Sequence, residues 1–92
     1  MNVYLIWGSY DDGYEYDSAR GDWYERDDDG NLLVFKELDD AKKQLKNVVN
    51  QFTSEYRRSK IEWGEDGMSA TLIPYYHPDE EWVFNIETSV IK

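Results

Sequence analysis

The middle of the chain shows the clearest hydrophobic pattern. Its apolar residues recur at steps of three and four, which places them on one face of a helix. They are Leu38, Ala41, Leu45, Val48, Val49, Phe52 and Tyr56. Lysines and amides fill most of the other positions. The pattern predicts one amphipathic helix from about residue 38 to 58.

On both sides of this segment the sequence changes to short runs rich in aromatic and β-branched residues, which are typical of strands. The predicted strands are residues 3–7, 22–26, 32–36, 61–63, 70–75 and 81–87. Turn residues separate them, with Asp-Gly at 12–13, 29–30 and 66–67 and His-Pro-Asp at 77–79. Asp-Gly between such runs is a strong hairpin signal. Residues 8–21 hold either a further hairpin around 11–13 or an irregular loop.

Alternation in the last predicted strand places Trp82, Phe84 and Ile86 on one buried face. In the first strand both alternating sets are apolar. We expect the odd-numbered residues of the run 3–7 to face the helix and Tyr4 and Ile6 to face away from it.

These elements predict an α+β fold. We expect a largely antiparallel β-sheet of five to six short strands with one long α-helix (about 38–58) packed on one face, in a single compact domain over residues 1–92. One helix of this length cannot cover both faces of such a sheet. The uncovered face is therefore a candidate surface for dimerisation or partner binding.

Composition restricts what this fold can do. The 92 residues include 20 Asp and Glu against 10 Lys and Arg, and there is no Cys. Disulfides and thiolate metal sites are excluded, so packing must carry the stability. The net charge of -10 repels phosphate backbones and anionic lipids, which disfavours direct binding to nucleic acid or membranes. The expected partners are cationic.

The charge is unevenly distributed along the chain. Residues 1–35 carry a net charge of -7, residues 36–60 carry +3 and residues 61–92 carry -6. The basic middle segment coincides with the predicted helix. We expect Arg57, Arg58 and Lys60 to lie at the end of that helix, where its dipole favours positive charge. This explains the basic segment without a nucleic-acid site.

The ends and the apolar runs suggest a location. No run approaches the ~20 apolar residues that span a bilayer. The first residues lack the cationic start and the cleavage site of a secretory signal. We expect a cytoplasmic protein, in the host cytoplasm if it is phage-encoded.

Catalytic and metal motifs are weak. The one histidine, His77, stands beside Pro78 with no recognisable Ser or Cys nucleophile, and the glycines form no phosphate loop. We expect no enzyme and no cofactor. Residues 25–36 place acids at positions 1, 3 and 5 of an EF-hand loop and Gly at 6, but Lys36 replaces the bidentate Glu at 12. We interpret residues 27–31 as a hairpin turn, with a weak Ca²⁺ site as the alternative.

Two segments interleave acids with aromatic residues, at 10–17 and 22–29. Such residues can act as a solubilising surface. They can also recognise a partner, because Tyr and Trp anchor interfaces and a field of one sign steers association with a basic cleft. Acids on alternate strand residues lie about 6.6–6.8 Å apart, roughly two nucleotide rises along one DNA strand.

These acidic clusters resemble those of phage-encoded DNA-mimic inhibitors of the anti-CRISPR or anti-restriction type. The resemblance implies a small acidic protein that occupies the basic, nucleic-acid-binding surface of a target such as a nuclease. We expect the turn tip at 27–29 to make the main contact, with Asp11 and Asp12 beside it if the two loops are adjacent. The full set of expected partner-binding residues is Asp11, Asp12, Tyr14, Glu15, Asp17, Asp22, Trp23, Glu25, Asp27, Asp28, Asp29, Glu65, Asp66, Asp79, Glu80 and Glu81.

Two alternatives share the same surface. One is an immunity protein or antitoxin that neutralises a basic toxin. The other is a structural or regulatory module that forms a homodimer through the uncovered sheet face.

Overall fold

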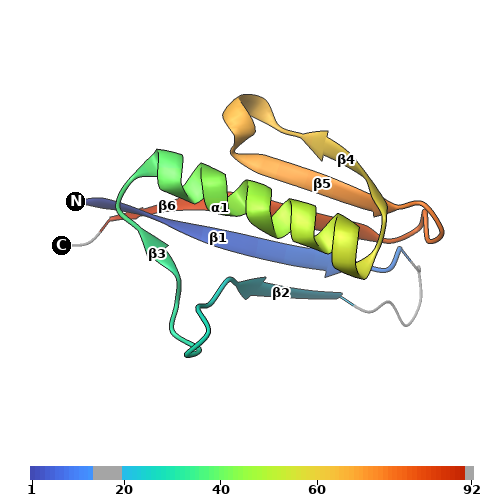
Figure 1. Ribbon diagram of the computed structural model, residues 1–92, viewed down its shortest axis with the longest axis horizontal. Helices are drawn as coiled ribbons and strands as arrows, with labels where there is room; N and C mark the ends of the chain where they lie inside the picture. Colours follow the sequence, from blue (N-terminus) through green and yellow to red (C-terminus); the bar gives the residue numbers. More distant parts are fainter. Residues whose placement is uncertain (14–19, 91–92) are drawn as a thin grey trace.

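The computed structural model describes residues 1–13 and 20–90. Over these ranges a sheet forms one layer and a helix the other, with the helix lying across one face of the sheet (Figure 1). The strands are β1 (Asn2–Asp11), β2 (Arg20–Tyr24), β3 (Val34–Phe35), β4 (Ser59–Trp63), β5 (Ser69–Pro74) and β6 (Glu81–Val90). The helix α1 (Leu38–Gln51) continues into a π-helical turn, η1 (Phe52–Tyr56), and the 3₁₀ turn η2 (Glu65–Gly67) joins β4 to β5. The predicted α+β fold is confirmed.

The described strands form one antiparallel sheet in the order β2-β1-β6-β5-β4, and β3 also pairs with β1. The central pair is β1 with β6, which stay in register from Asn2 opposite Val90 to Asp11 opposite Glu81. β2 and β3 pair with different halves of β1. The strands before the helix (β1 to β3) and the strands after it (β4 to β6) are therefore joined into one sheet by the pairing of β1 with β6.

The core lies between α1 and the sheet. Ala41, Leu45 and Val49 are four residues apart and have no exposed surface. They pack with Ile6 and Leu72 among the buried residues of the sheet. Burying a Leu or Val side chain contributes about 1.5–3 kcal/mol, so this stripe holds the helix on the sheet.

The helical segment ends two residues earlier than predicted. Arg57 is extended, with φ -144° and ψ 122°, and its N–H donates to the Phe52 carbonyl at 2.8 Å. The Thr53 hydroxyl then accepts a hydrogen bond from the Ser59 N–H at 3.0 Å and fixes the entry into β4. Arg57 therefore caps the end of the helical segment, as expected, whereas Arg58 and Lys60 lie beyond it.

The expected orientation of β1 is also wrong. Ile6 is fully buried in the core under the helix, and Tyr4 packs against the same core. In the register, Ile6 lies opposite Ile86 and Gly8 lies opposite Phe84. Opposed residues share a face, so burial of Phe84 and Ile86 places the even-numbered residues of β1 toward the helix. Trp7 therefore projects from the uncovered face.

The predicted turns all lie between strands. At residues 27–31 a tight turn follows the isolated bridge between Arg26 and Leu32, and Gly30 adopts a positive φ of 84°. The predicted strand 32–36 is reduced to the two residues of β3. Of the two alternatives left open for residues 8–21, the hairpin is the one that forms, because β1 and β2 pair from Trp7 opposite Tyr24 to Asp11 opposite Arg20.

Candidate partner-binding site

Three strands bring acids together on the uncovered face of the sheet. Asp11 on β1 lies opposite Glu81 on β6, and on its other side it lies opposite Arg20 on β2. Asp22 lies opposite Ser9, two residues before Asp11 on the same side of β1. Because opposed residues share a face, these acids project away from the helix.

These acids border a hollow of about 460 Å³. We call it the acidic hollow and define it by Trp7, Ser9, Asp11, Asp22, Glu81 and Val83. Trp7 and Val83 are half-buried and form its apolar wall, whereas Asp22 and Glu81 are exposed. The Asp11 carboxylate accepts a hydrogen bond from the Gly13 N–H at 2.8 Å, which fixes its orientation.

Two connections add further acids at this end of the molecule. Gly13 has a positive φ of 79° and lies so close to the Asp79 carbonyl that a Cβ atom would collide with it. The loop after β1 and the turn before β6 are therefore in contact. This contact places Asp12 and Asp79 at the same end of the sheet as Asp11 and Glu81.

A tyrosine and a glutamate lie further along the same face. Tyr24 lies opposite Trp7 on the edge strand β2 and is 38% exposed. Its hydroxyl donates to the Glu87 carboxylate, and this hydrogen bond raises the pKa of Tyr24, helped by desolvation and by the negative charges of Glu87 and Asp22. Glu87 is therefore a further acid on the same uncovered face as the acidic hollow.

Glu80 is engaged within the molecule. Its carboxylate pairs with the Arg57 guanidinium at 2.7 Å and accepts a hydrogen bond from the Trp82 indole at 3.5 Å. Both partners lie on the helix-covered side. Desolvation, followed by the charges of Glu80 and Asp12, raises the pKa of the neighbouring Tyr10. Glu80 therefore joins the end of the helical segment to β6 and lies apart from the acidic hollow.

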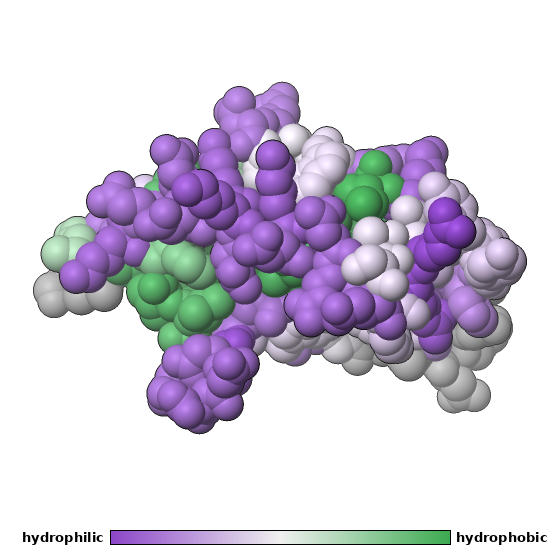
Figure 2. Space-filling view, in the orientation of Figure 1, coloured by the Kyte–Doolittle hydropathy of each residue, from purple (hydrophilic) through white to green (hydrophobic). Residues whose placement is uncertain are grey.

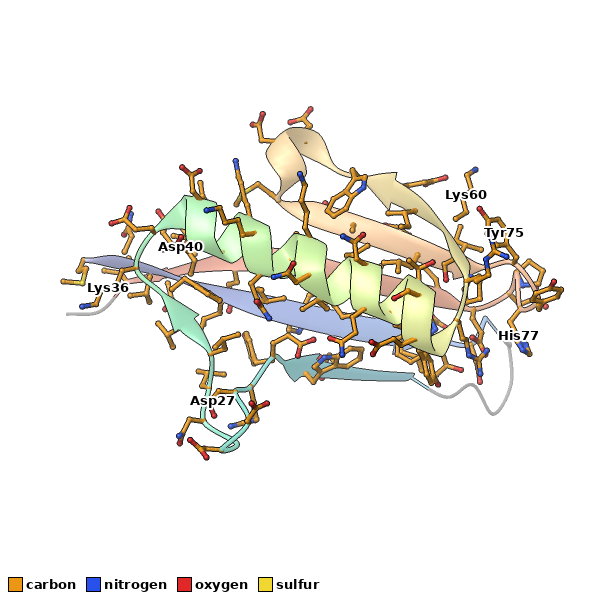
Figure 3. All side chains as sticks on the ribbon, in the orientation of Figure 1. Asp27, Lys36, Asp40, Lys60, Tyr75 and His77 are labelled. Atoms are coloured by element: carbon orange, nitrogen blue, oxygen red, sulfur yellow. The ribbon has the colours of Figure 1, made fainter. Side chains whose placement is uncertain are left out.

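The turn tip at residues 27–29 lies away from the acidic hollow. The Asp27 carboxylate accepts hydrogen bonds from the N–H groups of Asp29 and Asn31 at 3.0 and 2.9 Å, which confirms the predicted hairpin turn. The turn follows the end of β2 that is remote from Asp11, and Figure 3 shows Asp27 on the loop that projects below the left half of the molecule and His77 at its right-hand end. The two loops are therefore not adjacent, so Asp11 and Asp12 do not lie beside this tip.

Glu65 and Asp66 lie on the helix-covered side. Asp66 borders a groove of about 690 Å³ together with Trp63 and the lysines Lys42, Lys43 and Lys46, and Glu65 is its neighbour in η2. Figure 2, viewed from this side, shows a largely hydrophilic surface along the helix, with the turn at 26–31 projecting from it. The lysines of α1 are thus separated by the sheet from the acidic hollow.

The structure therefore brings together Asp11, Asp12, Asp22, Asp79 and Glu81 from the predicted set. Tyr14, Glu15 and Asp17 lie outside the described residues. Sequence reasoning did not select Trp7, Ser9 and Val83, which complete the acidic hollow.

Within the described part of the chain, no helix is long and apolar enough to cross a membrane. Among residues 1–13 and 20–90, no group of three or more His, Cys, Asp or Glu side chains is arranged so that it could hold a metal ion. Comparisons with protein-family models, with curated proteins and with solved structures found no match.

Proposed function

We propose that this protein is a small acidic inhibitor that binds the basic, nucleic-acid-binding surface of a target protein through the acidic hollow. The observation that supports this function best is the grouping of Asp11, Asp22 and Glu81 around Trp7 on the uncovered sheet face. An indole beside several carboxylates has the composition of an anchor for a basic surface.

The electrostatics of the whole molecule favour such a partner. The net charge of -10 accelerates association with a basic protein and repels free nucleic acid. The lysines of α1 lie on the opposite side of the sheet from these acids, whereas Arg20 lies opposite Asp11 in the register. A phosphate-binding cleft would thus meet carboxylates where it normally meets phosphates.

The same geometry disfavours a homodimer centred on the acidic hollow. A twofold interface brings identical patches together, so the patch that holds Asp11, Asp22 and Glu81 would face the same three acids of the second copy. Like charges placed together in this way are repulsive. A basic toxin stays an alternative target, since it would present the same complementary charge.

A binding experiment tests the proposal. The protein is immobilised, partners are recovered from a lysate of its source, and they are identified by mass spectrometry after elution with a salt gradient. The recovered partner is then purified and its Kd is measured. The proposal expects a nucleic-acid-binding protein whose Kd increases with salt, because exposed charge pairs are screened.

Two triple variants make the test specific. Asp11→Asn, Asp22→Asn and Glu81→Gln neutralise the acidic hollow, while Asp27→Asn, Asp28→Asn and Asp29→Asn neutralise the turn tip. Both triples remove three negative charges, and the Asn side chains keep the oxygen acceptors that Asp11 and Asp27 use in their turns.

Exposed ion pairs contribute about 0.2–1 kcal/mol each. Loss of three pairs should therefore weaken binding about 3- to 150-fold in the acidic-hollow triple. The turn-tip triple should bind within about twofold of the wild type, a difference of about 0.4 kcal/mol. A larger loss in the turn-tip triple than in the acidic-hollow triple would contradict the proposal.

A further inference from the structure

A second groove lies on the helix-covered side, between the end of the helical segment and the edge strand β2. It has a volume of about 470 Å³, within the range of small-ligand sites. We call it the aromatic groove and define it by Trp23, Phe52, Tyr56 and Trp82 with the carboxylates of Glu25 and Glu55. It lies on the other face of the sheet from the acidic hollow, and Tyr10, which lines that hollow, packs on Trp82 of the aromatic groove with ring centroids 4.4 Å apart.

Gly8 determines where Trp23 lies in this groove. The two residues are opposite each other in the register, and a Cβ atom on Gly8 would lie 2.6 Å from the Trp23 indole. Without that atom the indole lies directly over β1. There it makes edge-to-face contacts with Trp82 at 6.0 Å and with Phe84 at 5.8 Å between ring centroids.

The helical segment supplies the opposite wall. Phe52 and Tyr56 are one turn apart in η1, with ring centroids 5.2 Å apart, and Phe52 packs on Trp82 at 4.9 Å. Trp23, Phe52 and Trp82 are half-buried, and the first two both pack on Trp82, so these rings are held in place before any ligand binds. Tyr56 is 60% exposed and lies at the mouth of the groove.

Two acids line the groove, and the Arg57 guanidinium lies over its outermost ring, Tyr56. Glu25 extends from the end of β2, and Glu55 extends from η1. The Gln51 amide donates to the Glu55 carboxylate at 3.1 Å and orients it. Aromatic faces attract cations, and neighbouring carboxylates strengthen that preference. A neutral apolar ligand would gain nothing from the two acids.

We propose that the aromatic groove binds the side chain of an arginine presented by a partner protein. The planar guanidinium can stack on an aromatic ring while its N–H groups donate to carboxylates. The protein already contains one such contact, since the Arg57 guanidinium lies 5.4 Å from the centre of the Tyr56 ring. Lysine lacks the planar group, and a quaternary ammonium has no N–H to donate.

The test follows the indole N–H signals by NMR while capped Gly-Arg-Gly peptide is added. The four tryptophans act as separate reporters once each signal is assigned with a Trp→Phe variant. Trp23 and Trp82 line the aromatic groove, Trp7 lines the acidic hollow and Trp63 lies in the groove beside the lysines. The arginine peptide should shift the Trp23 and Trp82 signals and leave Trp63 unchanged. The capped Gly-Lys-Gly peptide and tetramethylammonium should bind more weakly.

A pair of variants isolates the carboxylates. Glu25→Gln with Glu55→Gln should weaken arginine binding about 2- to 30-fold, the loss of two exposed ion pairs. The control, Glu65→Gln with Asp66→Asn, removes two charges from a remote turn and should change the affinity less than twofold. Asn tolerates the positive φ of 56° at that position.

Each contrary outcome has a distinct meaning. Shifts of Trp7 alone would overturn the aromatic groove and leave the acidic hollow as the arginine site. Tighter binding of tetramethylammonium than of arginine would overturn arginine as the ligand. Equal losses in the two double variants would show that overall charge, and no specific contact, controls binding.

Discussion

Gly8→Ala should destabilise the protein by displacing one tryptophan. Gly8 is buried in the centre of the sheet, and its α-carbon faces the Trp23 indole. An added Cβ atom would lie 2.6 Å from the Cε2 and Cζ2 atoms of that ring. Because the indole is rigid, the whole side chain must move away from β1. The edge-to-face contacts of Trp23 with Trp82 and Phe84 would then be lost.

The expected size of the effect follows from these contacts. Aromatic pairs contribute about 0.5–1.5 kcal/mol each beyond their buried area, so losing two costs about 1–3 kcal/mol. Replacing Gly by Ala offsets about 0.4–1 kcal/mol of this by restricting the unfolded chain. The midpoints of these two ranges leave a net loss of about 1.3 kcal/mol in the free energy of unfolding. This should lower Tm by about 5–10 °C for a chain of this size.

Urea unfolding followed by far-ultraviolet circular dichroism measures this loss. Gly21→Ala is the matched control, because a Cβ atom on Gly21 meets no other atom within 4 Å. It should leave the protein as stable as the wild type or slightly more stable. In a Trp23→Ala background, Gly8→Ala should lose its penalty, since the two residues are coupled. An unchanged penalty in that background, or equal stability of the two Gly→Ala variants, would refute the reasoning.

Two further predictions concern the core and the edge of the sheet. Leu45→Ala should lower the free energy of unfolding by about 2–5 kcal/mol, because a fully buried side chain leaves a cavity, whereas exposed Asn47→Ala should change it by less than about 0.5 kcal/mol. Equal unfolding midpoints in urea would contradict this. Glu87→Gln should lower the Tyr24 pKa toward the usual value of about 10, because the carboxylate acceptor is its main cause of elevation. Because the pKa of Tyr24 is raised in the folded state, the stabilisation that this hydrogen bond contributes is fully present below about pH 10 and is lost as the pH rises through the folded-state pKa. This loss of stability should be smaller in the Glu87→Gln variant. A ¹³C-tyrosine NMR titration checks the shift, and an unchanged Tyr24 pKa would exclude Glu87 as the cause.

The elements could be predicted from local patterns. The stripe of Ala41, Leu45 and Val49 determines the helix, because period and burial coincide over the whole segment. The alternation of Trp82, Phe84 and Ile86 likewise indicates β6. The end of the helix could not be predicted in this way. It depends on a Thr53 hydroxyl that accepts a backbone hydrogen bond six residues further along the chain.

The orientation of β1 could not be read from β1 alone, since both of its faces are apolar. The neighbouring strand decides it, through Ile86 opposite Ile6 and Phe84 opposite Gly8. Gly8 was the one local signal, because a glycine inside an apolar strand often marks close approach of another group. Here that group is Trp23.

The candidate site depended on long-range pairing in the same way. Asp11 and Glu81 are 70 residues apart in sequence and meet only because β1 pairs with β6 over its full length. Hairpin signals indicate neighbouring strands but do not determine how strands on either side of a helix meet. Local acid clustering therefore favoured the turn tip at 27–29, whereas the register favours the acidic hollow.

The central claim is that the protein occupies a surface that otherwise binds nucleic acid. A competition titration tests it most directly: the affinity of the protein for its purified target is measured at increasing concentrations of duplex DNA. Competitive occlusion predicts that the apparent Kd rises in proportion to the DNA concentration without a plateau. An apparent Kd that stays constant, or a complex that contains target, DNA and this protein together, would contradict the account.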